Sequence, residues 1–463
     1  MQKREFTQLN DPRLLRRGNK ILQDLFRNSV HSIRQVASDE ASAKGAYRFL
    51  LNDNVSEQDI TFDLSVNCRA ACAGRPVVCI QDTSQVNLGK HTGRIKKDKF
   101  IGPTNNKNGR SLGFFMHPSL VVDAMDFIPY GYADIKLWSR TEDGTTKYDR
   151  DYTSLPTDEK ESYKWIEVSK NTKDALSDVV PWLVIVQDRE GDIYEQFADI
   201  PDDKTALLVR ASSNRQLADK SKLFSCLSET PLSGTYSIAI PARNGRAKRQ
   251  AKVEVRFKQI EICKPSGAKK GLPQTIKLFL VEAKEVDYNG SDGIHWRLLT
   301  TLQVKDFDDA RTCIEWYSWR WMVEEVFKIV KKEGFDIEAS ELEYASSVRK
   351  LTLMIMEVII KLFLMRLAYS APETDIAAES CFTHDELEFL EHQIKSLEGK
   401  TEKQKNPFKQ KQLKRYTWAI ARLGGWKGYE SKRRPGITTL WIGMRLFKAA
   451  YQGWKIKIDV STR

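Results

Sequence analysis

Two aspartates stand at the ends of apolar segments that have almost the same form. Residues 77–81 lead into Asp82, and residues 183–187 lead into Asp188. Short continuous apolar runs are typical of buried strands, and the active sites of open sheets gather at strand ends. Two nearby carboxylates repel each other unless a cation is present, and Mg²⁺ prefers oxygen ligands of this kind. The pair therefore indicates a Mg²⁺ site, with a helix N-cap or turn role for each aspartate as the alternative.

A third carboxylate lies in a segment with helical spacing, residues 310–333. Tyr317, Arg320, Glu324, Lys328 and Lys331 follow one another at intervals of 3, 4, 4 and 3 residues. This spacing places them within an arc of roughly 80° on one face of a helix. Such a face could hold a metal ion through the glutamate and phosphate through the cations. The alternative is a solvated face with ion pairs between residues four apart.

The charge balance points to a polyanionic partner. The chain has 463 residues, with 74 Lys and Arg against 62 Asp and Glu, which gives a net charge of +12. Much of the excess lies in residues 400–434, which contain twelve basic and two acidic side chains. Nucleic acid is the commonest partner for such a surface, and a solvated loop in a basic protein is the alternative.

Composition argues against several other classes of protein. A hydrophobic content of 41% and a charged content of 29% fit neither a disordered nor a membrane protein. The most apolar stretch, residues 351–369, contains Glu357, Lys361 and Arg366, so it is not expected to span a membrane. The seven cysteines include no Cys-x-x-Cys pair, which argues against a zinc finger and fits a reducing cytoplasmic compartment.

The pattern of elements divides the chain into three parts. Residues 1–70 predict a helical bundle rich in arginine, which could be a DNA-binding module or an ordinary bundle. Residues 71–370 predict an α/β domain whose strands carry the aspartates, with alternating residues at about 213–303 that indicate a β-rich insertion. Residues 371–463 predict a further helical domain.

The spacing Tyr-x2-Arg-x3-Glu-x6-Lys over residues 317–331, with the two aspartates upstream, resembles the signature of the insertion-sequence-four family of DDE transposases. The resemblance extends over nearly the whole chain. It is carried by residues 45–49 and 52–55 near the N-terminus, 81–83, 113–123 with His117, 158–165 and 188–193 in the α/β part, and 418–425 and 431–437 near the C-terminus.

The resemblance implies a ribonuclease-H-like, or retroviral-integrase-like, catalytic core with a β-rich insertion, flanked by helical N- and C-terminal domains. It implies that Asp82, Asp188 and Glu324 are the catalytic, metal-binding residues. The metal would be Mg²⁺, with Mn²⁺ as a substitute, and the chemistry would be two-metal phosphoryl transfer.

The resemblance also implies residues that bind DNA. Tyr317, Arg320 and Lys331 would hold a phosphate of the non-transferred strand, with Arg210 and Lys328 nearby. Trp296 would stack on a flipped base, whereas from the sequence alone it could be a buried aromatic of the insertion. Residues 336–344 are acidic where the resemblance leads one to expect a basic run, so a DNA contact in that segment is not carried over to this chain.

The function that follows is cut-and-paste DNA transposition: nicking, hairpin formation and resolution, and strand transfer. The expected partners are double-stranded DNA, both transposon-end inverted repeats and target, and a second copy in a homodimeric synaptic complex joined through residues 371–463. The expected location is the bacterial cytoplasm at the nucleoid, with no membrane partner. The alternatives are a metal-dependent nuclease without strand transfer, and a catalytically silent DNA-binding inhibitor or relic; the intact carboxylate set argues against the last.

Overall fold

The computed structural model describes residues 4–28, 32–37, 39–91, 93–96, 98–104, 111–141, 155–240, 249–288, 290, 293–332, 334–370, 375–429 and 434–461. The predicted segment 431–437 therefore lies partly outside the described residues. None of the described helices is long and apolar enough to cross a membrane.

The N-terminal part is helical, as predicted. It contains α1 (Pro12–Asn28), the short α2 (Ile33–Val36), α3 (Glu40–Leu51) and α4 (Glu57–Cys72). The Asp39 side chain accepts a hydrogen bond from the backbone N–H of Ser42, and Ser56 and Asp59 form a capping box. These caps satisfy N–H groups that have no partner within the helix, which is why α3 and α4 begin where they do.

The α/β part is built on a mixed sheet. Its central strands are β1 (Val77–Gln81), β4 (Leu112–Asp123), β5 (Pro129–Trp138), β6 (Leu183–Gln187) and β7 (Thr205–Arg210). β1 is parallel to β6 and β6 to β7, whereas β4 is antiparallel to both β1 and β5. Two short strands, β2 (Ser84–Asn87) and β3 (Gly102–Pro103), also pair with β4.

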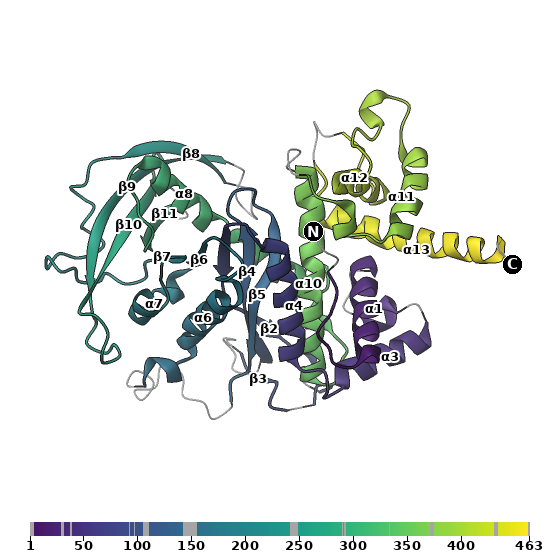
Figure 1. Ribbon diagram of the computed structural model, residues 1–463, viewed down its shortest axis with the longest axis horizontal. Helices are drawn as coiled ribbons and strands as arrows, with labels where there is room; N and C mark the ends of the chain where they lie inside the picture. Colours follow the sequence, from purple (N-terminus) through teal and green to yellow (C-terminus); the bar gives the residue numbers. More distant parts are fainter. Residues whose placement is uncertain are drawn as a thin grey trace.

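The β-rich segment is continuous with this sheet. Within the segment predicted to be β-rich, an antiparallel meander is formed by β8 (Gly234–Ile240), β9 (Arg249–Cys263), β10 (Thr275–Glu285) and β11 (His295–Thr300). β11 then pairs with β7, so that the eleven strands found among the described residues belong to one sheet. Figure 1 shows the long β8–β11 strands curving away from the central strands.

Helices cover both faces of the central strands, which explains their continuous apolar sequences. Val77, Cys79 and Ile185 belong to a cluster that includes side chains of α6 (Lys164–Leu176) and α7 (Tyr194–Asp199). Val78, Ile80 and Val186 belong to the other cluster, with α8 (Phe307–Ser318), α9 (Trp321–Lys331) and α10 (Ala345–Ser370). Successive residues of one strand thus pack alternately into two hydrophobic cores, one on each face of the sheet.

The helix predicted over residues 310–333 is two helices. α8 ends at Ser318 and α9 begins at Trp321, with Trp319 and Arg320 in a turn between them. The turn is tightened by hydrogen bonds between residues three apart, including Met322 N–H to Trp319 O at 2.8 Å. The Trp319 ring packs edge-on against Phe127 at 4.8 Å, which anchors the turn to the end of β4. The interruption thus coincides with a tertiary aromatic contact, in a segment that contains neither glycine nor proline.

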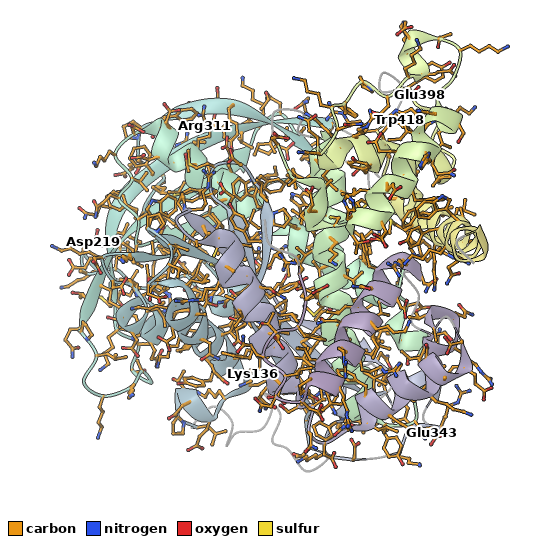
Figure 2. The ribbon with its side chains drawn as sticks, turned by 45° about the vertical axis from the view of Figure 1, so that its right-hand side comes forward. Lys136, Asp219, Arg311, Glu343, Glu398 and Trp418 are labelled. Atoms are coloured by element: carbon orange, nitrogen blue, oxygen red, sulfur yellow. The ribbon has the colours of Figure 1, made fainter. Side chains whose placement is uncertain are left out.

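The C-terminal part is also helical, with α11 (His384–Leu397), α12 (Leu413–Leu423) and α13 (Ile437–Ser461). The long helix α10 contacts β5 and α9 on one side, and α1, α3, α12 and α13 on others (Figure 1). Trp418 of α12 is fully buried where these helices meet (Figure 2). Short 3₁₀ turns occur at Gly89–His91, Thr157–Glu159, Glu161–Tyr163, Arg189–Gly191, Ile337–Ala339, Ala378–Ser380 and Glu402–Gln404.

Candidate active site

The register of the parallel strands brings the two aspartates to the same edge of the sheet. Ile80 of β1 is paired with Val186 of β6, so Asp82 and Asp188 follow at equivalent positions. The glutamines that precede them, Gln81 and Gln187, point to the α6 side, and alternation turns the aspartates towards α8 and α9. The prediction that Asp82 and Asp188 lie together at the ends of buried strands is therefore consistent with the fold.

The α8–α9 turn supplies the groups that meet the aspartates. The Tyr317 hydroxyl donates to Asp188 Oδ1 at 2.9 Å. The Arg320 guanidinium donates to Asp82 Oδ2 at 2.6 Å and to Glu324 Oε1 at 2.5 Å. One arginine thus joins a strand-end aspartate to the helix glutamate, and one tyrosine holds the other aspartate.

Burial governs the electrostatics of this cluster. It raises the pKa of Asp82 to about 6, against the opposing effects of the Arg320 charge and the Thr83 N–H bond. Burial also raises the pKa of Tyr317 to about 12, and the Asp188 charge adds to that effect. Burial acts to lower the pKa of Arg320, but the neighbouring carboxylates outweigh it and keep the guanidinium charged.

The three carboxylates fit a divalent cation in donor chemistry, because each supplies hard oxygen ligands. Within the part of the chain that the structure describes, however, no three His, Cys, Asp or Glu side chains are close enough together to hold a metal ion. Arg320 contacts both Asp82 and Glu324 and offsets part of their negative charge in this arrangement. Direct ligation by both would require the guanidinium to move away from them.

The other residues expected to bind DNA lie at different distances from this cluster. Arg210, at the end of β7, places Nη1 3.9 Å from Asp188 Oδ1. The half-buried Trp296 of β11 lies edge-on to Tyr317, with ring centroids 5.1 Å apart. Lys331 lies further along α9 and donates to Ser84 Oγ at 3.0 Å, and Lys328 is exposed. Arg210, Trp296, Tyr317 and Arg320 are thus grouped around the aspartates, whereas the two lysines extend the surface along α9.

The acidic segment at residues 336–344 pairs with a basic loop of the same chain. Glu343, labelled in Figure 2, lies 3.2 Å from Lys96 Nζ, and Glu341 lies 3.9 Å from Arg94. Glu338 accepts a bond from the backbone N–H of Asn87 at 3.0 Å. These carboxylates therefore hold the loop after β2 against the start of α10.

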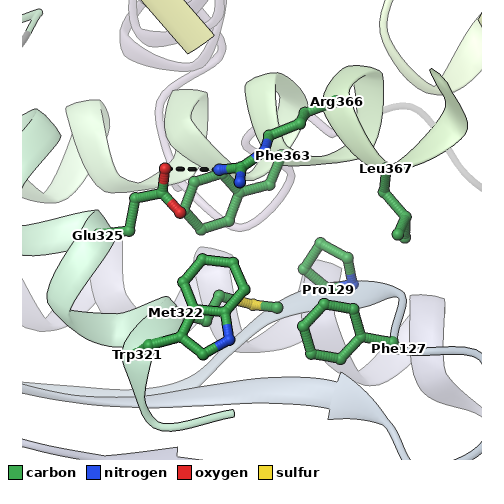
Figure 3. A pocket seen from close by; sticks show the side chains of 8 residues that line it. All are labelled: Phe127, Pro129, Trp321, Met322, Glu325, Phe363, Arg366 and Leu367. Atoms are coloured by element: carbon green, nitrogen blue, oxygen red, sulfur yellow. Dashed lines mark hydrogen bonds and ion pairs between the residues drawn. The ribbon is translucent and has the colours of Figure 1, made fainter. Parts of the chain in front are cut away.

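An apolar pocket of about 140 Å³ lies next to the α8–α9 turn (Figure 3). Glu325 and Arg366 form an ion pair of 2.5 Å at its rim, so Glu325 is held away from the aspartates. The pocket is lined by Phe127, Pro129, Trp321, Met322, Glu325, Phe363, Arg366 and Leu367. Glu324 and its neighbour Glu325 therefore have different surroundings, which makes them a matched pair for experiment.

The sequence analysis missed a buried polar network below the aspartates. It consists of fully buried side chains from β1, β4, β6, α6 and α7: Gln81, His117, Gln187, Ser169 and Gln196. Burial lowers the pKa of His117 well below its usual value, so the ring is neutral. The signal in the sequence was the repeated glutamine before each aspartate, a polar residue at the end of two apolar runs.

Comparison with known proteins supports the interpretation of the N-terminal helices as a DNA-binding module. Residues 3–55, which include α1 to α3, match the family model described as transposase DNA-binding. A solved structure of a piggyBac transposase synaptic complex with hairpin DNA aligns with 79% of this chain and 68% of its own, at 10% identity and a TM-score of 0.37. A TM-score of this size does not establish a shared fold.

Proposed function

We propose that this chain is a DDE-type DNA transposase of the insertion-sequence-four family, acting by cut-and-paste transposition. Its motif residues resemble those of the Tn-five transposase. The observation that carries the proposal is the convergence of Asp82 and Asp188, from adjacent parallel strands, with Tyr317, Arg320 and Glu324 of the α8–α9 turn. The match of residues 3–55 to a transposase DNA-binding model supports it independently. The mixed sheet with both aspartates on its central strands is consistent with a ribonuclease-H-like core.

The proposed metal site consists of Asp82, Asp188 and Glu324. Mg²⁺, or Mn²⁺ in its place, would supply activation of an attacking oxygen and stabilisation of a leaving oxygen at phosphorus. The protein's own part is to place Asp82 and Asp188 on adjacent strand ends and to offset part of the charge of Asp82 and Glu324 with Arg320 until DNA is bound.

The DNA-binding residues suit a strongly bent DNA end. A guanidinium can bind two phosphate oxygens at once, so Arg320 can exchange its carboxylate partners for a phosphate. The Tyr317 hydroxyl and the Arg210 guanidinium can donate to the same strand, with Lys328 and Lys331 further along α9. Trp296 offers an aromatic face beside Tyr317, and base stacking on such a face contributes about 1–3 kcal/mol per base.

The proposed reaction series uses the same site for each step. Water attacks a phosphodiester at the transposon end and leaves a 3′-hydroxyl. That hydroxyl attacks the opposite strand to form a hairpin, water reopens the hairpin, and the freed 3′-hydroxyl joins target DNA. Each step forms one P–O bond and breaks another. Both ends must be paired, so we propose a homodimeric synaptic complex joined through residues 371–463, in the bacterial cytoplasm at the nucleoid.

The test uses DNA that carries the inverted repeats flanking the gene, incubated with the protein and Mg²⁺ and resolved on a denaturing gel. We expect hairpin ends with the wild type and with Glu325→Gln, and none with Glu324→Gln. The Glu325 variant is the matched control because it removes a neighbouring carboxylate that pairs with Arg366.

Each other outcome favours another function. Nicks without hairpins would favour a nuclease without strand transfer. Binding without cleavage in Mg²⁺ or Mn²⁺ would favour a silent DNA-binding inhibitor or relic. Hairpins that persist in Glu324→Gln would remove Glu324 from the catalytic set.

A further inference from the structure

The buried glutamines Gln81 and Gln187 connect the two strands that carry the aspartates. Each is the last residue of its strand and has no exposed surface. Gln187 Nε2 donates to Gln81 Oε1 at 2.8 Å, one residue before Asp82 and Asp188. A side-chain bond therefore joins β1 and β6 at the point where the aspartates emerge.

Gln187 is also fixed by α6 and α7. Its Nε2 lies 3.0 Å from Ser169 Oγ and 3.0 Å from Gln196 Oε1, and its Oε1 accepts a bond from Gln196 Nε2 at 2.6 Å. Gln196 Nε2 also donates to the Gly191 carbonyl at 2.8 Å, in the turn after Asp188. A Cβ at Gly191 would come within 2.2 Å of Gln187 Oε1, so the glycine lets this turn rest directly on the glutamine.

Gln81 is connected to the residue that follows Asp82. His117 Nε2 lies 3.4 Å from Gln81 Oε1, and His117 Nδ1 lies 2.8 Å from Thr83 Oγ1. Because Gln81 Oε1 only accepts, the neutral imidazole donates through Nε2 and accepts the Thr83 hydroxyl at Nδ1. The backbone N–H of Thr83 in turn donates to Asp82 Oδ1 at 2.7 Å. The network thus reaches the segment after each aspartate.

We infer that Gln81 and Gln187 are positioning residues that set the separation and orientation of Asp82 and Asp188. Fully buried amides must satisfy their donors and acceptors, and few arrangements of these side chains do so at once. The network lies on the face of the sheet opposite the reacting groups, so it acts through the strand ends. This inference rests on the proposed metal-dependent function.

The matched variants come from α6. Ser169 and Thr172 are both fully buried, and each hydroxyl donates to a carbonyl four residues earlier at 2.7 Å. Ser169 also contacts Gln187 and Gln196, whereas the Thr172 hydroxyl donates to the Val168 carbonyl within α6. Ser169→Ala and the shape-matched Gln187→Met disturb the network, and Thr172→Val is the control.

The measurement is Mn²⁺ affinity, from the electron paramagnetic resonance signal of free Mn²⁺ titrated with full-length protein bound to a DNA end, together with the melting temperature of each variant. We expect Gln187→Met to weaken Mn²⁺ binding about 10- to 100-fold, as loss of residues that orient metal ligands commonly does. Ser169→Ala should give a smaller loss in the same direction, and Thr172→Val should leave the affinity unchanged.

The outcomes separate this inference from the proposed function. If both network variants lower the melting temperature but bind Mn²⁺ like the wild type, the glutamines are only structural and the inference is wrong. If Gln187→Met does not fold, Ser169→Ala decides in the same way. If the wild type binds Mn²⁺ no better than Glu324→Gln does, the proposed metal site itself is wrong.

Discussion

Arg320 links the charged groups of the site, because its one guanidinium pairs with two carboxylates. Its guanidinium contacts Asp82 and Glu324; the Arg320 and Asp82 side chains are each 19% exposed, whereas Glu324 is 39% exposed. Breaking the pair with Asp82 leaves that carboxylate without its cation in a poorly solvated place. Any phosphate or metal ion that enters must therefore replace an existing interaction, which favours ligands that bring charge of their own.

The pKa of Asp82 gives a prediction at the residue scale. Because burial raises it to about 6 in the native protein, against about 3.9 in an unfolded chain, the native state binds more protons between these pH values. The free energy of unfolding therefore falls as pH rises through this window, and the lost stability stays lost above it. Asp82→Asn removes this titration. Between pH 4 and pH 8, the wild type should therefore lose on the order of 1–3 kcal/mol of unfolding free energy relative to the Asp82→Asn variant.

Urea denaturation of metal-free protein at a series of pH values measures this change. Asp202→Asn is the control, because the pKa of Asp202 is shifted in the opposite direction to that of Asp82. Burial acts to raise the pKa of Asp202, but hydrogen bonds from Lys173, Lys204 and Thr205 lower it to about 2. Its stabilising effect is present above about pH 4 and is lost as pH falls towards 2. Parallel curves for wild type and Asp82→Asn between pH 4 and 8 would contradict the prediction.

At the scale of elements, the sequence predicts the strands and most helices but not the turn that shapes the site. The apolar runs before Asp82 and Asp188 identify β1 and β6, because strands buried on both faces have no polar alternation. The helical spacing of residues 310–333 is real on either side of Arg320. At the interruption, Trp319 packs against Phe127, almost two hundred residues away, and no local pattern reveals such a contact.

The same limit applies to the polar network. The glutamine before each aspartate is visible in the sequence, but its partners Ser169, His117 and Gln196 are brought in by α6, β4 and α7. Their contribution is a tertiary arrangement of hydrogen bonds. Likewise, the alternation of residues 236–257 predicts a meander, but it does not reveal that β11 pairs with β7.

The α8–α9 turn gives a prediction at this scale. Trp319→Ala removes the aromatic contact with Phe127 and should lower the free energy of unfolding by about 1–3 kcal/mol. Because the turn aims Tyr317 and Arg320 at the aspartates, DNA cleavage should fall at saturating DNA. Denaturation and single-turnover cleavage assays measure the two effects.

Trp316→Ala is the control for this prediction. Trp316 lies on α8, three residues before Trp319, and packs against Trp182 at 5.7 Å. The Trp316→Ala variant should have a lower free energy of unfolding but should keep a larger fraction of the wild-type cleavage rate than Trp319→Ala does. If both variants lose cleavage in proportion to their loss of stability, the turn has no special role in aiming the site.

At the scale of the whole molecule, α10 contacts the N-terminal, α/β and C-terminal parts. One continuous buried cluster runs from Phe6 through Ile80 and Ile355 to Tyr451. The matched DNA-binding segment therefore shares a core with the sheet. Arg4 contributes to this union because it donates to Glu357 of α10 at 2.6 Å and to the Tyr130 carbonyl of β5 at 2.6 Å.

This union predicts a large effect from a residue far from the aspartates. The Arg4 and Glu357 side chains are only 3% and 1% exposed. Arg4→Met leaves the glutamate charge buried, so the free energy of unfolding should fall by about 3–5 kcal/mol. The double variant Arg4→Met, Glu357→Met should recover most of the loss, because it removes both charges.

Urea denaturation followed by circular dichroism tests this prediction. Lys20→Met is the control, since its pair with Asp24 is 42% exposed on the lysine side and should contribute roughly 0–1 kcal/mol. A loss of similar size in Arg4→Met and Lys20→Met would show that the buried pair does not join the parts.

The sheet is continuous from β6 through β7 to β11, so strand pairing fixes the spacing between residues on these strands. Asp188, Arg210 and Trp296 are borne by three successive strands, and neighbouring strands lie about 4.8 Å apart. Strand pairing therefore places β6 and β11 two strand spacings apart, or roughly 10 Å across the sheet. In the proposed function, Asp188 binds metal and Trp296 stacks on a base, so backbone hydrogen bonding would set the interval across the sheet that the DNA end has to match.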